Sequence, residues 1–195
     1  MESEVSVMRI EKQKSVTDKK TINTIEEFEL IPENIVSEYV DGRIRVFDSL
    51  TLEQHRLKTS ILMTADDYLR KHHIKDKVFY FHLDVQLGND IFEPDLFMCD
   101  KKLLTEKRCV GVPDWIVEIT TPKTENWKYT IKLKKYLEAG VKEYWIINPE
   151  MQVVHIYRTS ARRTTVRVYS MDEKIRVGRF EDLYIDLKNG VNNPT

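Results

Sequence analysis

Two carboxylates, Asp95 and Glu118, are the strongest candidates for chemistry in this sequence. Asp95 follows a proline, and Glu118 interrupts an apolar run from Trp115 to Ile119. A carboxylate in an apolar strand is costly to bury unless a cation pairs with it. If neighbouring strands bring Asp95 and Glu118 together, the pair suits Mg²⁺, a hard ion that takes one or two protein carboxylates and keeps several waters. Such an ion can activate a water molecule and polarise a phosphodiester.

The spacing alone leaves a structural role open for the same residues. In that alternative, Asp95 caps a bulge and Glu118 pairs with a lysine in the interior. Asp114 is a rival for Asp95 as a ligand, because it shares a face with Glu118 on an extended strand. We favour Asp95, since two ligands on neighbouring strands converge better than two at opposite ends of one strand.

A lysine on the helix expected after Glu118 can supply positive charge. Lys132 falls on the shoulder of that helix's apolar stripe, one turn before Tyr136, whereas Lys128 and Lys135 lie farther round. If Lys132 bends toward the Glu118 strand, its ammonium would stabilise the charge that develops on a reacting phosphate. The alternative is an ordinary solvated helix lysine.

The segment from Pro113 to Pro149 must position these groups, and it predicts a strand, a helix and a second strand. Near-continuous apolar runs such as the one around Glu118 are typical of strands covered on both faces. Parallel strands joined by a helix cross over with a right hand, and Gly140 is expected to end the helix in a left-handed cap. This unit forms the centre of the predicted fold.

The residues before this unit predict a flap, a long helix and a hairpin. Residues 1–21 mix charges without a period and are expected to form a flexible arm. The predicted elements are a capped helix from Thr24 to about Pro32, a hairpin flap over Ser37–Phe47 turning at Asp41-Gly42, an amphipathic helix over Leu52–His72, and antiparallel strands over Val78–Leu87 and Ile91–Cys99. Pro94 inside the last strand, next to Asp95, indicates an edge position or a bulge.

The remaining segments complete an α/β fold. Residues Asp100–Val112 predict a loop with a short helical turn. After Pro149, three runs predict a meander on the sheet edge: Val153–Tyr157, Thr165–Ser170 and Ile175–Val177. The order of elements predicts one domain over residues 22–195, with a mixed sheet flanked by helices.

Composition excludes several classes of protein. The formal net charge is −1, so no global basic field indicates nucleic acid, although arginines around the predicted meander could contact a DNA backbone. Cys99 and Cys109 are too few for a disulfide scaffold or a cysteine zinc site. No run has the length of a transmembrane helix or the apolar core of a signal peptide, so we expect a cytoplasmic protein without membrane contact.

Taken together, these residues resemble the PD-(D/E)XK nuclease superfamily and, more closely, its Uma-type restriction endonuclease family. Pro94-Asp95 matches the first half of the superfamily motif, and Glu118-Ile119-Thr120 stands in place of its Glu-X-Lys half. The resemblance covers about residues 22–158, and its further features are Glu38 ahead of Asp41-Gly42, His55 opening the long helix, the Lys132 to Tyr136 spacing, and Gly140-Val141-Lys142-Glu143-Tyr144-Trp145. Thr120 replaces the lysine of the superfamily motif, a departure that the Uma-type family shares.

This resemblance implies a restriction-endonuclease-like fold and a Mg²⁺-dependent endonuclease that hydrolyses phosphodiester bonds in DNA, with Mn²⁺ as a substitute ion. It implies Asp95 and Glu118 as metal ligands and Lys132 as their electrostatic partner. Glu38 from the flap and His55 from the first long helix would complete the pocket, and Glu93 is an outer candidate.

The missing Glu-X-Lys lysine keeps a second function open. A nuclease fold can serve as a nucleic-acid-binding or protein-interaction module with little or no catalysis. Metal binding separates the two, because such a module needs no ion at Asp95 and Glu118. An assembly protein that uses the C-terminal meander as a dimer edge is compatible with either reading, and a homodimer would supply the two sites that two cuts in a duplex need.

Overall fold

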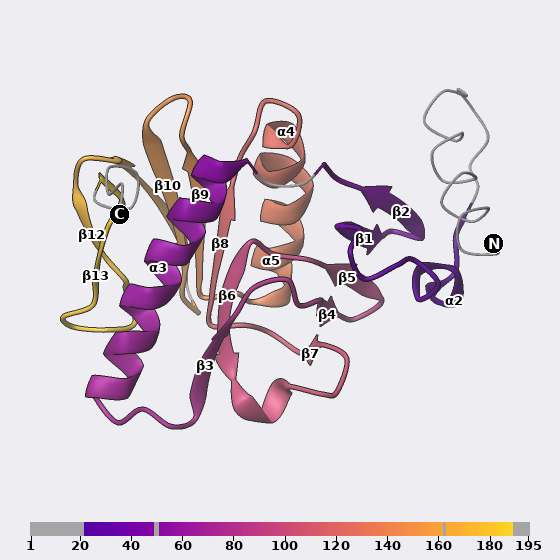
Figure 1. Cartoon of the computed structure of the whole chain (residues 1–195), viewed down its shortest axis with the longest axis horizontal. Coiled ribbons are helices and arrows are strands. Elements are labelled where there is room, and N and C mark those ends of the chain that lie inside the picture. The colour runs from indigo at the N-terminus through magenta and orange to yellow at the C-terminus, as the bar shows by residue number, and fades with distance from the viewer. Residues whose placement is uncertain (1–21, 49–50, 162, 189–195) are drawn as a thin grey trace.

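The computed structural model describes residues 22–48, 51–161 and 163–188 (Figure 1). The predicted arm, residues 1–21, lies outside them. The main layer is a mixed sheet in the order β11-β10-β9-β8-β6-β3. Its strands are β3 (Lys77–Tyr80), β6 (Leu96–Asp100), β8 (Trp115–Ile119), β9 (Glu143–Asn148), β10 (Val153–Thr159) and β11 (Thr164–Ser170). The predicted α/β class with a mixed sheet is therefore confirmed.

β8 and β9 form the predicted parallel pair inside this sheet. Glu118 is in register with Ile146, and every residue of both strands is buried. The crossover consists of α4 (Glu125–Trp127), a π-helical turn η3 (Lys128–Lys132) and α5 (Leu133–Ala139), and Gly140 caps it at a φ of 91°. The expected helix is present, but a π turn interrupts it, and such turns are frequent at functional sites.

Helices cover both faces of the main sheet (Figure 1). α3 (Leu52–Lys71) begins after the N-cap Thr51, and its buried apolar side chains pack on the face of β8 that carries Trp115 and Val117. Tyr136 of α5 packs with Ile116 on the opposite face. Side chains alternate along a strand, so Glu118 lies on the α5 side.

A smaller sheet, β2-β1-β5-β4-β7, contains the predicted flap. Asp41 and Gly42 have φ values of 51° and 72°, which a two-residue hairpin turn of the primed type requires. The strands are β1 (Ser37–Val40), β2 (Arg43–Val46), β4 (Val85–Leu87), β5 (Asp90–Phe92) and β7 (Cys109–Val110). Before them, α2 (Ile25–Phe28) has the predicted capping box of Thr24 and Glu27, although it ends before Pro32.

The predicted runs Val78–Leu87 and Ile91–Cys99 pair antiparallel, as expected, but the prediction that each is one continuous strand is wrong. The first run divides into β3 and β4 and the second into β5 and β6, and the halves join different sheets. His82, at a φ of 50°, lies in the first break. Pro94, which has no N–H for a ladder, lies in the second. Asp95 therefore lies in the link before β6, and β6 is an interior strand.

The C-terminal meander is only partly as predicted. β10 and β11 extend the sheet edge, but the third run forms β12 (Lys174–Arg176), which pairs with β13 (Tyr184–Asp186) in a separate sheet. The loop before β8 contains one helical turn, η2 (Lys101–Leu103). Among the helices that the structure describes, none has the length and apolarity needed to cross a membrane.

Candidate active site

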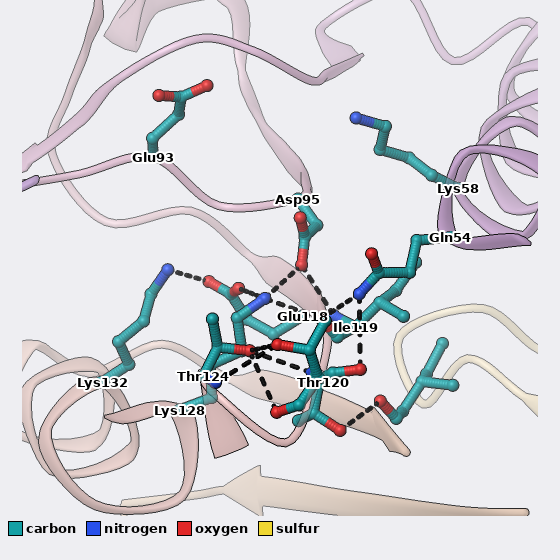
Figure 2. Close-up of polar contacts among 12 residues, drawn as sticks. Gln54, Lys58, Glu93, Asp95, Glu118, Ile119, Thr120, Thr124, Lys128 and Lys132 are labelled. Carbon is teal, nitrogen blue, oxygen red and sulfur yellow. Dashed lines mark hydrogen bonds and ion pairs between the residues drawn. The ribbon is translucent and has the colours of Figure 1, made fainter. Parts of the chain in front are cut away.

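A cleft of about 650 Å³ opens at the carboxyl end of β8. Its walls come from the flap, from α3, from the link before β6 and from the crossover helix. The charged side chains that line it are Glu38, Arg45, Asp48, Lys58, Glu93, Asp95, Glu118, Lys123, Lys128 and Lys132. Both carboxylates singled out in the sequence therefore lie on one cavity (Figure 2).

Asp95 is held by the backbone of β8. The Ile119 N–H donates to Asp95 Oδ2 at 2.7 Å, and Lys128 Nζ lies 2.5 Å from the same oxygen. Burial raises the pKa of this carboxyl, but the charge and hydrogen bond of Lys128 outweigh it and lower the pKa below its usual value. Asp95 is therefore a carboxylate at neutral pH.

Glu118 is fully buried beneath two lysines. Lys132 Nζ contacts its Oε1, and Lys128 Nζ lies 2.9 Å from its Oε2. The Lys128 contact does not have hydrogen-bond geometry, so Oε2 is a buried oxygen without a hydrogen bond. Burial raises the pKa of Glu118, and the lysines only partly offset it.

Lys128 lies where three oxygens converge. Its ammonium nitrogen is 2.5 Å from Asp95 Oδ2, 2.9 Å from Glu118 Oε2 and 2.8 Å from the carbonyl oxygen of Ile119. The sequence placed Lys128 away from the site on a uniform α-helix, and that expectation is wrong. In the structure Lys128 begins the π turn and Lys132 ends it, and both point at the carboxylates (Figure 2).

Lys132 connects Glu118 to the flap. Its ammonium donates to Glu38 Oε1 at 2.5 Å, and the Trp127 indole N–H donates to Glu38 Oε2 at 2.7 Å. Burial opposes the charge of Lys132, but Glu118 and Glu38 outweigh it and raise the pKa of the ammonium. The structure thus brings Glu38, Asp95, Glu118 and Lys132 together.

α3 forms the facing wall, although not through the predicted His55. His55 is exposed and does not line the cleft. One turn of α3 instead turns Gln54 and Lys58 inward, because these two side chains share the buried face with Leu57. Gln54 Nε2 donates to the carbonyl oxygens of Ile119 and Thr120 at 3.4 and 3.3 Å.

Glu93 belongs to a polar chain along the cleft wall. His82 Nδ1 lies 3.1 Å from Glu93 Oε1, and Lys58 Nζ lies 3.1 Å from His82 Nε2. The Glu93 N–H donates to Glu38 Oε1 at 3.3 Å. Glu93 therefore contacts a site residue without facing Glu118, as expected of an outer candidate.

Asp114 is excluded as the partner of Glu118. It precedes β8 at the opposite end of the strand and pairs with Lys77, Lys142 and Arg179. The sequence analysis missed Gln54, Lys58 and Trp127 as site residues. Lys58 did carry a signal, because it lies three and four residues before Ile61 and Leu62 and so places a lysine on the apolar face of the helix.

The convergence point has the donor chemistry of a hard divalent cation. Its donors are two carboxylate oxygens and one backbone carbonyl oxygen, which Mg²⁺ and Mn²⁺ prefer. The buried Glu118 Oε2 without a hydrogen bond is an available ligand atom. In the described part of the chain, no three His, Cys, Asp or Glu side chains form a metal-binding group, so further ligands would be water or substrate.

Comparisons with known proteins agree with this fold. A family model described as "Uma2: Putative restriction endonuclease" matches residues 25–187. Comparison with curated proteins gives no match. Among solved structures, the chain is similar to one from Anabaena variabilis, described as "a putative nuclease belonging to DUF820", at 21% identity and a TM-score of 0.70 over 86% of this chain and 97% of that one. At that identity the likeness shows a shared fold. The family model spans most of the chain, which therefore belongs to the Uma2 family of restriction-endonuclease-like proteins.

Proposed function

We propose that this protein is a Mg²⁺-dependent endonuclease that hydrolyses phosphodiester bonds in DNA. One observation carries the proposal: Asp95, Glu118 and the Ile119 carbonyl direct three oxygens at one cation position beside an open cleft. Membership of the Uma2 family supports the reaction class.

Asp95, Glu118 and the Ile119 carbonyl would hold the ion, and Mn²⁺ would substitute for Mg²⁺ because both prefer oxygen ligands. The bound ion would lower the pKa of water and polarise the phosphoryl oxygens. Gln54 hydrogen-bonds the Ile119 carbonyl and so fixes the orientation of that ligand. Outer partners of this kind typically tune the affinity of a metal site.

Lys132 is the residue that stabilises developing charge. Its ammonium is anchored by Glu38 and Glu118, lines the cleft and stays protonated because its pKa is raised. A fixed positive charge in a partly water-excluded site favours the more negative transition state over the bound substrate. Trp127 and the Glu93 N–H hold Glu38, and Glu38 in turn holds Lys132.

The cleft rim suits a polyanionic substrate. Arg45 from the flap and Lys123 from the loop after β8 are exposed cations that line it. Phosphate contacts by such groups supply affinity that falls as salt rises. DNA binding is therefore expected to weaken as ionic strength rises. Metal binding at Asp95 and Glu118 should depend less on ionic strength.

One observation favours a second candidate, a binding module without catalysis. Lys128 already forms ion pairs with Asp95 and Glu118, so both buried carboxylates have a cation partner without a metal. A protein of this kind would bind DNA through the rim and leave it intact. The two functions differ in the effect of a divalent ion: an endonuclease cleaves DNA when the ion is present, whereas a binding module leaves the DNA intact.

Supercoiled plasmid nicking tests the proposal. Purified protein is incubated with plasmid in Mg²⁺ or Mn²⁺, with a chelator lane, a single-stranded RNA substrate in parallel and the Glu118→Gln variant as control. The proposal expects metal-dependent nicking of DNA that the chelator and the substitution abolish. DNA retention on a gel without nicking in either ion would favour the binding module.

A further inference from the structure

We propose that Lys128 competes with the divalent cation for its site, so that metal binding requires the Lys128 side chain to leave the carboxylates. The inference rests on the proposed function only in taking Asp95 and Glu118 as the metal ligands. It concerns how the site is filled in the absence of metal, and it does not require that the protein cut DNA.

The first support is that the ammonium and the ion need the same oxygens. Lys128 Nζ lies within 2.5 to 2.9 Å of Asp95 Oδ2, Ile119 O and Glu118 Oε2. An Mg²⁺ ion bound to these oxygens would lie about 2.0 to 2.1 Å from each. Two cations cannot occupy one triangle of oxygens at those distances, so occupancy by one excludes the other.

The second support is the balance of charge. Glu38, Asp95 and Glu118 face Lys128 and Lys132, so the cluster has one more carboxylate than ammonium groups. Buried carboxylates are unstable without compensating charge. Lys128 supplies that compensation in metal-free protein, and a divalent ion would supply it in metal-bound protein.

The third support is that the Lys128 ammonium has open space in the cleft to move into. Its residue lines the cleft, so the flexible four-carbon stem can turn its ammonium toward solvent without moving the backbone. Lys132 differs, because its ammonium is clamped between Glu38 and Glu118 and it does not contact Asp95. The two lysines of one π turn therefore have different roles: Lys132 remains in place, and Lys128 exchanges with the ion.

Calorimetric titration with Mn²⁺ tests the exchange directly. The apparent affinity of a site is lower when the site is free in only a small fraction of the molecules. Lys128→Met removes the competing ammonium, so this variant should bind Mn²⁺ at least about tenfold more tightly than wild type. Lys132→Met is the matched control, since it removes an equally buried charge from Glu118 but none from the convergence point. Its gain should stay below about threefold.

A charge-preserving variant separates competition from loosening of the site. Lys128→Arg keeps a cation next to Asp95 and should not gain affinity, whereas a general loosening would raise affinity in both Lys128 variants. Circular dichroism melts confirm that each variant is folded. If Lys128→Met does not fold, the wild-type protein still gives a readout: Mg²⁺ should shift the NMR signal of the Lys128 side chain, assigned by its loss in Lys128→Arg, more than that of Lys132.

The outcomes distinguish this inference from the proposed function. Equal Mn²⁺ affinities for wild type and Lys128→Met, or equal gains in Lys128→Met and Lys132→Met, overturn the competition while leaving metal-dependent cutting intact. Tighter Mn²⁺ binding by Lys128→Met without any DNA cutting supports the competition and removes the nuclease. Absence of binding in all variants overturns the inference together with the metal site.

Discussion

Both ends of β8 carry a buried lysine between two carboxylates, yet the two clusters differ in their balance of charge and in whether a buried carboxylate oxygen is left without a hydrogen bond. At the start of the strand, Lys77 lies 2.6 Å from Asp100 and 2.5 Å from Asp114, and Lys142 and Arg179 also pair with Asp114. There the cations outnumber the carboxylates. At the end of the strand, carboxylates outnumber lysines, and Glu118 Oε2 lacks a hydrogen bond.

Solvent access sharpens this difference. The outer partners of Asp114 are exposed, with 68% of the Lys142 side chain and 39% of the Arg179 side chain accessible. Lys142 and Arg179 therefore extend the Lys77 cluster into an ion-pair network at the surface. Glu118 and its lysines are buried, and they border a cleft of about 650 Å³. A buried lysine–carboxylate pair alone therefore does not identify a site, whereas excess carboxylate beside a cleft does.

The largest expected contrast comes from making the same substitution at both ends. Asp95→Asn should lower the rate of plasmid nicking about 1000-fold or more, beyond the 10- to 100-fold cost of losing an outer partner of a metal ligand. Asp114→Asn should cut at the wild-type rate per folded molecule. Equal losses in the two variants would show that the clusters do not differ in function.

Lys132→Met should lower the nicking rate by about 100-fold, the size of effect seen when one fixed charge-stabilising group is removed from an active site. DNA retention should change little, since the rim cations remain. Lys135→Met is the matched control on the same helix, because Lys135 pairs with Asp41 and Asp90 and does not line this cleft. A comparable loss in the control would remove the special role of Lys132.

Lys77→Met should affect stability and leave activity unchanged. Burial opposes the charge of Lys77, but hydrogen bonds to Asp100 and Asp114 raise its pKa, so the ammonium is well compensated. Its removal should lower the free energy of unfolding by about 2 kcal/mol, less than the usual cost of an unpaired buried charge because Arg179 and Lys142 still face Asp114. Urea unfolding measures this change, and slower cutting at unchanged stability would contradict it.

Asp84 predicts a smaller, pH-dependent effect. Burial raises its pKa from 3.8 to about 7, and Arg108 only partly opposes this shift. Between these pH values the folded protein binds more protons than the unfolded chain, so this residue makes stability fall as pH rises from about 4 to about 7. Asp84→Asn should remove that slope and add about 1 kcal/mol at pH 8, a discounted value because 24% of the side chain is exposed. Thermal melts at pH 5 and pH 8 measure it, and a stabilisation confined to pH 5 would have the wrong sign.

Local sequence signals were sufficient for most elements of the fold. The Asp41-Gly42 turn, the cap at Thr24 and the apolar run of β8 each act over a few residues, and all appear in the structure. The division of the predicted hairpin between two sheets was not foreseen, because the apolar runs on either side of Glu93-Pro94-Asp95 do not show that they belong to different sheets.

The site was foreseen only where a residue type was unusual for its element. A carboxylate in an apolar strand identified Glu118, and a proline before an aspartate identified Asp95. Lys128 was missed because its position depends on a π turn that a uniform helical period does not reveal. Gln54 replaced His55 because the rotation of α3 about its axis is set by long-range packing of Leu57 against the sheet.

The most direct test of the difference between the two clusters is the anomalous scattering of a Mn²⁺-soaked crystal. We predict one peak about 2 Å from Asp95, Glu118 and the Ile119 carbonyl, with Lys128 displaced toward the cleft, and none between Asp100 and Asp114. A map without a peak at Asp95 and Glu118, in which Lys128 still bridges the two carboxylates, would contradict the assignment of this cluster as a metal site.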